Sequence, residues 1–319
     1  MEKGYTVHGG ARRISQPELV RLEKLGVHRD VYMHDFDLTE PNSVFRTIQK
    51  TPVDEFYNLA AQSFVGYSWE LPVYTSDVDG LGVLRILDSL RTLSPHTRFY
   101  QASTSEMFGV AQEFPQRETT PFYPRSPYGV AKVFGHFITR NYRESFGMHA
   151  SSGILFNHES PLRGPEFVTR KISLAMAKLA LGGSEPCQLG NLDAQRDWGF
   201  AAEYVEGIWR MLQQDQADDY VLATGTMTSV RDFAGYVAGA LGMSLDWNGE
   251  GLAEFATDRK SGKRVVEVCS KFFRPAEVDL LMGDSSKARS VLGWRPVVDA
   301  QQLAELMAHA DFDMLSKLT

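Results

Sequence analysis

Short apolar runs alternate with longer amphipathic runs through the first half of the chain, and this alternation is what most limits its fold. Strands are expected at 4–11, 30–33, 56–60, 97–103 and 149–156, and helices at 41–50, 73–93 and 128–146. Strands joined by helical crossovers run parallel, so the pattern predicts an α/β fold with a doubly wound, mostly parallel, Rossmann-like sheet. We expect this domain to span residues 1–163 and a smaller C-terminal substrate-binding region to span residues 164–319.

The second half of the chain is less regular. Helices are expected at 166–181, 202–213 and 230–241, with a last helix from Ala300, and a strand is expected at 219–224. The polar stretch 188–200 is expected to be a loop, and the charged segment 247–264 is expected to include a mobile loop.

Polar or small residues stand at or just after the ends of several expected strands. In a doubly wound sheet, ligands bind outside the carboxyl ends of the strands, so these positions are candidates for a binding site. They are Arg12, Asp37, Ala61, Thr104 and Asn157.

Charge and cysteine content exclude several classes of function. The net charge of −7 provides no basic face to neutralise a nucleic-acid backbone, so any phosphate site must be built locally. Two cysteines, Cys187 and Cys269, without metal or disulfide spacing favour a reducing, cytoplasmic compartment, and no metal site is expected. No apolar run approaches the length of a membrane span.

The stretch from Tyr100 to Lys132 carries the strongest chemical signal. Tyr128 and Lys132 stand four residues apart on one face of an expected helix, which Ser126 and Pro127 would start. An ammonium beside a phenol favours the phenolate, so this pair can act as a base. Thr104 and Glu106, directly after an expected strand, add a hydrogen-bond donor and a second acid or base. Together these groups suit carbonyl chemistry, although a tyrosine and a lysine at this spacing are often an ordinary helix pair.

Several longer stretches resemble the GDP-mannose 4,6-dehydratase family, extended short-chain dehydrogenases/reductases that use NADP. The most specific is Phe-Asn-His-Glu-Ser-Pro from Phe156, together with the arginine segments around Arg196 and Arg274. The resemblance runs from Lys3 to about Met307. It implies conversion of GDP-mannose to GDP-4-keto-6-deoxymannose.

The resemblance assigns catalysis to four residues. Tyr128 would take the proton of the sugar 4-hydroxyl while hydride passes to NADP, and Lys132 would support the phenolate and hold the nicotinamide ribose. Thr104 would hydrogen-bond the developing carbonyl. Glu106 would remove the proton of carbon 5 and help expel the 6-hydroxyl as water. A simple epimerase has no need of such a base.

The family's cofactor contacts also carry over by position. Arg12 and Arg13 would bind the 2′-phosphate of NADP, although they could be a solvated turn. Asp37 and Leu38 would contact adenine or simply precede a helix, and His158 could be a satisfied loop histidine. The full cofactor set is Arg12, Arg13, Asp37, Leu38, Leu59, Ala60, Ala61, Ser63, Tyr74, Lys132, His158 and Arg163.

The nucleotide sugar needs cationic and carboxylate partners for its phosphates and ribose. The resemblance assigns this role to Ser63, Asn157, Val168, Lys171, Arg196, Arg274 and Glu277. It also suggests a homodimer or homotetramer. Two alternatives stay open: another nucleotide-sugar reductase or epimerase of the same family, and a non-catalytic remnant that binds nucleotide sugar or partner subunits.

The start of the chain departs from the family pattern. Lys3 and Gly4 are typical of the last turn of a helix. No glycine-rich Gly-x-x-Gly-x-x-Gly turn occurs, although such a turn holds the pyrophosphate in dinucleotide-binding folds. We therefore expect the first strand and its turn to be missing, and the 319-residue chain to bind NADP poorly and to be marginally stable.

Overall fold

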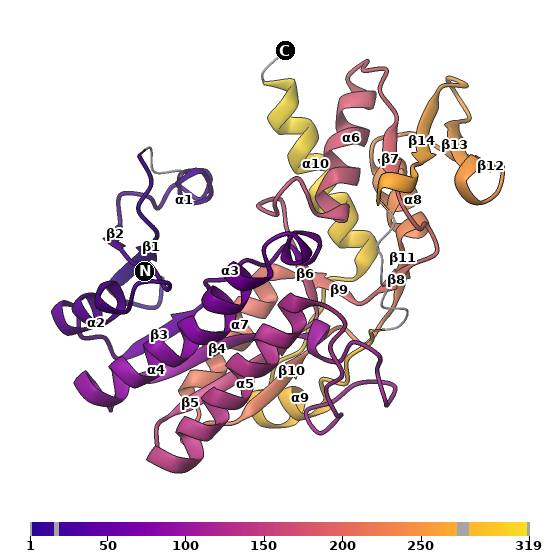
Figure 1. The fold of residues 1–319 in the computed structure, drawn as a ribbon. Coiled ribbons are helices and arrows are strands. Elements are labelled where there is room, and N and C mark those ends of the chain that lie inside the picture. The colour runs from indigo at the N-terminus through magenta and orange to yellow at the C-terminus, as the bar shows by residue number, and fades with distance from the viewer. Residues whose placement is uncertain (1, 16–18, 273–280, 318–319) are drawn as a thin grey trace. The chain divides into compact units, whose positions relative to one another are not determined.

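The structure is a computed structural model that describes residues 2–15, 19–272 and 281–317. Its contacts divide the chain into two compact units, each built from segments that are separate in the sequence. Figure 1 colours the chain by residue number. The first unit contains Met1–Met107, Ser126–Gly153 and Met211–Asp219; the second contains Phe108–Arg125, Ile154–Arg210 and Tyr220–Thr319. The division suggested by the sequence, between residues 163 and 164, stays a prediction.

Parallel strands form the centre of the first unit. They are β3 (Glu55–Asn58), β4 (Arg98–Thr104) and most of β5 (Ala150–Leu155), in a sheet of order β10-β5-β4-β3 whose strand β10 (Asp219–Leu222) is assigned to this unit only at Asp219. β3 and β4 pair in parallel. β1 (Val7–Ala11) and β2 (Val31–Asp35) pair in parallel as a separate two-stranded sheet. Within the described residues, β1 and β3 each have a neighbouring strand on one side only. The expected α/β fold with parallel sheets is confirmed.

The first unit also contains helices, some of which bury apolar residues against the sheet. They are α1 (Val20–Lys24), α2 (Pro41–Lys50), α3 (Pro72–Ser76), α4 (Gly82–Leu93) and α5 (Pro127–Phe146), with a short 3₁₀ turn η1 (Val65–Trp69). Val44 of α2, Ile86 and Leu90 of α4 and Phe99 of β4 are each 0% exposed in one core cluster. The single helix expected at 73–93 is interrupted, because a π-helical turn, η2 (Asp77–Leu81), separates α3 from α4.

The first turn of α5 forms as its sequence predicts. Ser126 has an extended backbone, its Oγ accepts a hydrogen bond from the Gly129 backbone N–H at 3.0 Å, and Pro127 follows as the first helical residue. The helix ends at Gly147, whose φ of 66° lies in the left-handed region. These signals fix where Tyr128 and Lys132 stand along the helix.

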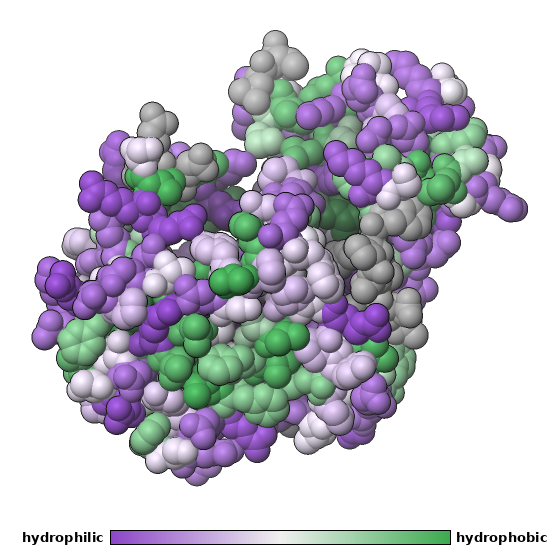
Figure 2. Space-filling view, in the orientation of Figure 1, coloured by the Kyte–Doolittle hydropathy of each residue, from purple (hydrophilic) through white to green (hydrophobic). Residues whose placement is uncertain are grey.

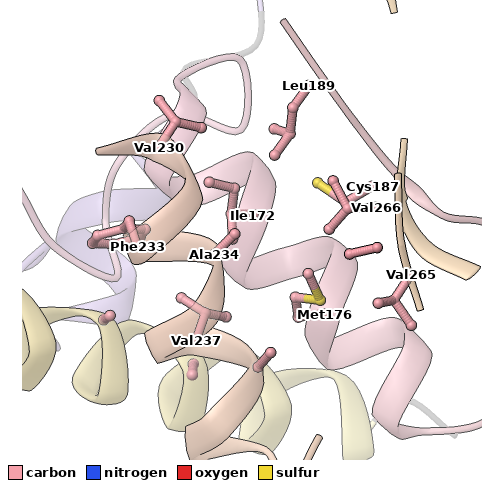
Figure 3. Packing of buried hydrophobic residues seen from close by; sticks show 14 of the residues in the cluster. Ile172, Met176, Cys187, Leu189, Val230, Phe233, Ala234, Val237, Val265 and Val266 are labelled. Atoms are coloured by element: carbon pink, nitrogen blue, oxygen red, sulfur yellow. The ribbon is translucent and has the colours of Figure 1, made fainter. Parts of the chain in front are cut away.

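Helices and a second sheet enclose the core of the second unit. The helices are α6 (Val168–Ala180), α7 (Ala201–Gln213), α8 (Val230–Ala240), α9 (Ser286–Leu292) and α10 (Ala300–Ser316). The sheet has the order β12-β13-β14-β7, with β7 (Cys187–Leu189), β12 (Leu245–Asn248), β13 (Phe255–Asp258) and β14 (Arg264–Val268). Figure 3 shows Ile172 and Met176 of α6 lying between α8 and β14, near Val237 and Val266.

The loop expected at 188–200 is wrong, and the segment 247–264, where a mobile loop was expected, contains strands as well as connecting turns. The stretch 188–200 contains the end of β7, β8 (Gln195–Arg196) and β9 (Trp198–Phe200), which pair with β14, β11 (Thr228–Ser229) and β6 (Asn157–Glu159) respectively. The segment 247–264 contains the antiparallel pair β12 and β13, joined through η4 (Gly251–Ala253). Buried apolar residues explain both, since Trp198 is 2% exposed and Ala256 is 0% exposed. The strands in these two segments are short and have a polar second face, so their sequence pattern is typical of a loop.

Candidate active site

Thr104 and Glu106 lie at the carboxyl end of β4. Thr104 is the last residue of the strand and Glu106 is the middle residue of the 3₁₀ turn η3 (Ser105–Met107). Their side chains are half-buried, whereas Ser103, Ser105 and Met107 between and around them are buried. The Glu106 backbone N–H donates to Thr104 Oγ1 at 3.3 Å. Both side chains are therefore partly exposed at this end of the strand.

Tyr128 and Lys132 are on the face of α5 that packs against β4 and η3. Tyr128 is 7% exposed and Lys132 is 3% exposed. The Lys132 ammonium lies 5.7 Å from the centroid of the Tyr128 ring and donates a hydrogen bond to the Ala102 carbonyl oxygen at 3.1 Å. Since Ala102 is two residues before Thr104 in β4, the structure brings the four expected catalytic residues to one end of this strand.

A buried carboxylate that the sequence analysis missed faces Lys132. Asp79 of η2 is 0% exposed, and its Oδ1 accepts a hydrogen bond from the Gln62 backbone N–H at 2.7 Å. Burial raises the pKa of Asp79 to about 6, against the charge of Lys132 and the Gln62 hydrogen bond, which lower it. Burial lowers the pKa of Lys132, and the charge of Asp79 opposes that shift.

The spacing of Asp79 from apolar residues in the sequence could have identified it as buried. It precedes Val83 by four residues and Ile86 by seven, and both are buried. A carboxylate at that spacing falls on the apolar face of a helix, where a charged group needs a partner.

Among the expected cofactor residues of the first unit, Arg12 and Tyr74 are brought together. Arg12 Nη1 donates to the Tyr74 hydroxyl at 2.7 Å, and the guanidinium lies 5.8 Å from the ring centroid. Arg13 is exposed and makes a loose ion pair with Asp35 at 3.9 Å. Both guanidinium groups are therefore accessible to an anion.

The residues after β2 and β3 differ in exposure. Asp37 Oδ1 accepts hydrogen bonds from the backbone N–H and the hydroxyl of Thr39; burial raises the pKa of Asp37, but these bonds and nearby arginines leave it lowered. Leu38 is 5% exposed in the core. Leu59, Ala60 and Ser63 are exposed and Ala61 is half-buried just past the end of β3. Small residues at the carboxyl end of a parallel strand leave room for a cofactor to approach the backbone.

His158 and Arg163 belong to the second unit. His158 lies in β6, where its Nδ1 is 2.9 Å from the Phe156 carbonyl oxygen and its ring stacks on Tyr204 at 5.2 Å. Burial lowers the pKa of His158 to about 4, so the ring is neutral near pH 7. Arg163 lies 3.5 Å above the Phe167 ring and pairs with Glu159 at 3.1 Å.

The expected substrate residues are spread along the second unit, apart from Ser63. Asn157 begins β6 and Val168 begins α6. Lys171 lies 3.2 Å above the Phe272 ring, and burial lowers its pKa. Arg196 is 8% exposed, and its Nη1 donates to the Gln195 carbonyl oxygen at 2.7 Å. Arg274 and Glu277 lie outside the described residues.

Two kinds of site can be checked across the described residues. No cluster of three or more histidine, cysteine, aspartate and glutamate side chains is arranged to hold a metal ion in this part of the chain. No helix within the described ranges is long and apolar enough to cross a membrane.

Comparison with solved structures defines the class of the fold. The chain is similar to RMD of Pseudomonas aeruginosa, solved with NADPH, with a TM-score of 0.76, 18% identity and coverage of 92% of this chain and 96% of that chain. It is also similar to dTDP-glucose 4,6-dehydratase of Bacillus anthracis, solved with NAD, with a TM-score of 0.78, 17% identity and coverage of 99% and 90%. The chain therefore has the Rossmann-like α/β fold of these structures.

Sequence comparison then identifies the family. The family model described as GDP-mannose 4,6 dehydratase matches residues 1–307. The GDP-mannose 4,6-dehydratase of Sinorhizobium fredii (strain HH103) is 52% identical over 322 residues, which cover 99% of this chain and 92% of that protein. The human GDP-mannose 4,6 dehydratase is 47% identical over 323 residues, covering 99% and 87%. The chain belongs to the GDP-mannose 4,6-dehydratase family.

Proposed function

We propose that the protein converts GDP-mannose to GDP-4-keto-6-deoxymannose by internal hydride transfer and elimination of water. The observation that carries this proposal is the gathering of Thr104, Glu106, Tyr128 and Lys132 at the end of β4. Family membership supports the same reaction.

Each of the four side chains has one task in this reaction. Tyr128 accepts the proton of the sugar 4-hydroxyl, and the Lys132 ammonium favours its phenolate form. Thr104 donates a hydrogen bond to the oxygen at carbon 4 as it becomes a carbonyl. The new ketone acidifies carbon 5, so Glu106 can remove that proton and pass a proton to the departing 6-hydroxyl, which leaves as water.

NADP is the cofactor in this proposal, and it supplies the acceptor and later the donor of the hydride. Arg12 and Arg13 would hold its 2′-phosphate, since both guanidinium groups are exposed past the end of β1. Proteins of similar fold are solved with either NADPH or NAD, so the preference for NADP in this proposal rests on the two arginines. Lys132 would hold the nicotinamide ribose.

The protein acts as a homodimer or homotetramer in the cytoplasm. Support for assembly comes from α5, where Val130, Phe134 and Phe137 are 57%, 42% and 50% exposed at a spacing that places them on one face. Figure 2 shows hydrophobic residues gathered over the helices α4 and α5. Support for a reducing compartment comes from Cys187 and Cys269, which are both free thiols.

An epimerase or reductase of the same fold is the second candidate, and a labelled substrate separates the three reactions. GDP-mannose carrying deuterium at carbon 4 is incubated with the protein and NADP, and the product is examined by mass spectrometry and NMR. A dehydratase gives a product that has lost one water and carries the deuterium at carbon 6. A product altered only at carbon 4, with its water retained, would overturn the proposal in favour of the second candidate.

A further inference from the structure

The π-helical turn η2 gives two neighbouring aspartates different surroundings. A π turn holds one more residue than an α turn and is found mainly at functional positions in helices. Asp77 is partly exposed and pairs with Arg85 at 2.7 Å. Asp79, two residues later, is 0% exposed. Asp77 therefore has an ordinary helix-surface role, whereas the burial of Asp79 calls for a different explanation.

Glycines bring the backbone of η2 directly against α5. A Cβ atom on Gly135 would lie 3.0 Å from the Asp79 carbonyl oxygen, and one on Gly80 would lie 3.5 Å from the Ala131 carbonyl oxygen. The Gly135 distance is tighter than an ordinary contact, so a side chain there would need its neighbour to move, whereas the Gly80 distance is an ordinary van der Waals contact. This close approach holds Asp79 beside the part of α5 that carries Lys132.

One oxygen of the Asp79 carboxylate has no hydrogen bond within the described part of the chain. Oδ1 accepts the Gln62 backbone N–H, whereas Oδ2 is buried and has no hydrogen-bond partner among the described residues. A buried carboxylate is costly unless a charge or a hydrogen bond offsets its loss of water. The charge that acts on it is the ammonium of Lys132, which is itself 3% exposed.

Lys132 is also tied to the sheet through a buried amide network. The Ala102 carbonyl oxygen accepts hydrogen bonds from Lys132 Nζ at 3.1 Å and from Gln101 Nε2 at 3.0 Å. Gln101 Oε1 in turn accepts a hydrogen bond from Asn58 Nδ2 at 2.8 Å. These partners are uncharged, so they orient the ammonium but cannot balance its charge.

We propose that Asp79, on the turn that packs against α5, is a positioning residue whose charge keeps Lys132 protonated. The inference rests on the proposed function, because Lys132 is assigned there to support the Tyr128 phenolate and to hold the cofactor ribose. Gln62 belongs to the 59–63 segment after β3, and its backbone N–H binds the Asp79 carboxylate. One buried side chain thus accepts a hydrogen bond from the expected cofactor segment and acts through its charge on Lys132.

Removing the charge of Asp79 should lower the pKa of Lys132. Burial favours neutral Lys132, and the Asp79 carboxylate is the charge that opposes this. Other titratable groups on the elements packed against this position include Tyr128 and His136 on α5, Glu106 on η3, Asp77 on η2 itself, Tyr74 on α3 and Arg85 on α4. β4 presents Tyr100 and the uncharged Gln101 and Thr104. Without the carboxylate, Lys132 loses its proton at a lower pH, and activity that needs the ammonium declines at a lower pH as well.

The test compares Asp79→Asn with Asp77→Asn. The second variant removes a carboxylate from the same turn but keeps the one that acts on Lys132. The kcat of each protein is measured against pH, with thermal melts alongside. We expect the alkaline limb of the profile to move down by about one pH unit or more in Asp79→Asn, as for the loss of one close charge. Asp77→Asn should lower the melting temperature and leave that limb in place. If Asp79→Asn is folded and the alkaline limb of its pH profile stays at the parent position, the proposal is overturned.

A second measurement needs neither activity nor a folded Asp79 variant. The Asp79 carboxyl is followed by ¹³C NMR against pH in the parent protein and in Lys132→Met. Loss of the ammonium should make Asp79 release its proton at a higher pH, again by about one unit or more. Equal titration in both proteins would refute the pairing. If the parent forms no dehydrated product, the proposed function fails, whereas this titration still decides whether Asp79 and Lys132 act on each other.

Discussion

The ion pair between Arg170 and Asp311 offers the sharpest test of what holds the second unit together. Arg170 on α6 is 4% exposed and Asp311 on α10 is 1% exposed, and Arg170 Nη2 lies 2.5 Å from Asp311 Oδ1. Ser173 Oγ donates to the other carboxylate oxygen at 2.6 Å. Asp311→Asn keeps the size of the side chain but removes its charge. The guanidinium of Arg170 is then buried without its counter-charge.

The expected loss of stability follows from this burial. Removing one partner of a buried ion pair costs about 3–5 kcal/mol, because the other charge stays out of water without compensation. That is a large part of the roughly 5–15 kcal/mol by which domains are stable. It corresponds to a fall in melting temperature of about 6–20 °C. The matched control is Asp313→Asn on the same helix, where the side chain is exposed and the loss should stay below about 0.5 kcal/mol.

Urea unfolding and scanning calorimetry measure both variants against the parent. A double variant, Arg170→Met with Asp311→Leu, removes both charges and should recover most of the stability lost in Asp311→Asn, since an apolar pair of similar volume needs no counter-charge. If the melting temperature of Asp311→Asn falls no further than that of Asp313→Asn, the reasoning is refuted. A double variant no more stable than Asp311→Asn would show that packing, and not charge, sets the loss.

Three further predictions concern the site and its helix. Glu106→Gln should slow water elimination about a hundred- to ten-thousand-fold, measured by solvent deuterium entering carbon 5; exchange at the parent rate would contradict its role as the base. Replacing Arg12 and Arg13 by alanine should weaken NADP much more than NAD in titrations, since each charge-assisted contact contributes about 1.5–3 kcal/mol; equal weakening would mean that the pair is only a turn. Ser126→Ala should lower the free energy of unfolding by about 1 kcal/mol through loss of the cap on α5, and an unchanged urea midpoint would contradict this.

Local signals were enough to predict much of the first unit. α2 spans the residues expected for it, and α5 begins within one residue of the expected start, because proline and a capping side chain act within a single turn. The pairing of Tyr128 with Lys132 follows from helical spacing alone. The run containing Thr104 and Glu106 was recognisable because a strand end places such residues at the edge of a parallel sheet.

Long-range contacts explain what the sequence analysis missed. The strands within 188–200 exist because β8 pairs with β11 and β9 pairs with β6, and no local pattern records those partners. The π turn that interrupts the helix at 73–93 is likewise set by its packing against α5.

The amino-acid sequence by itself determined the α/β class, the family and the catalytic spacing on α5, since each depends on periodicity or on residues close in the chain. The surroundings of those residues were decided by the tertiary structure. Burial lowers the pKa of Lys132, and the charge of Asp79, from another part of the chain, opposes that shift. Electrostatic effects of this kind depend on distance and on exclusion of water, and neither quantity exists until the chain has folded.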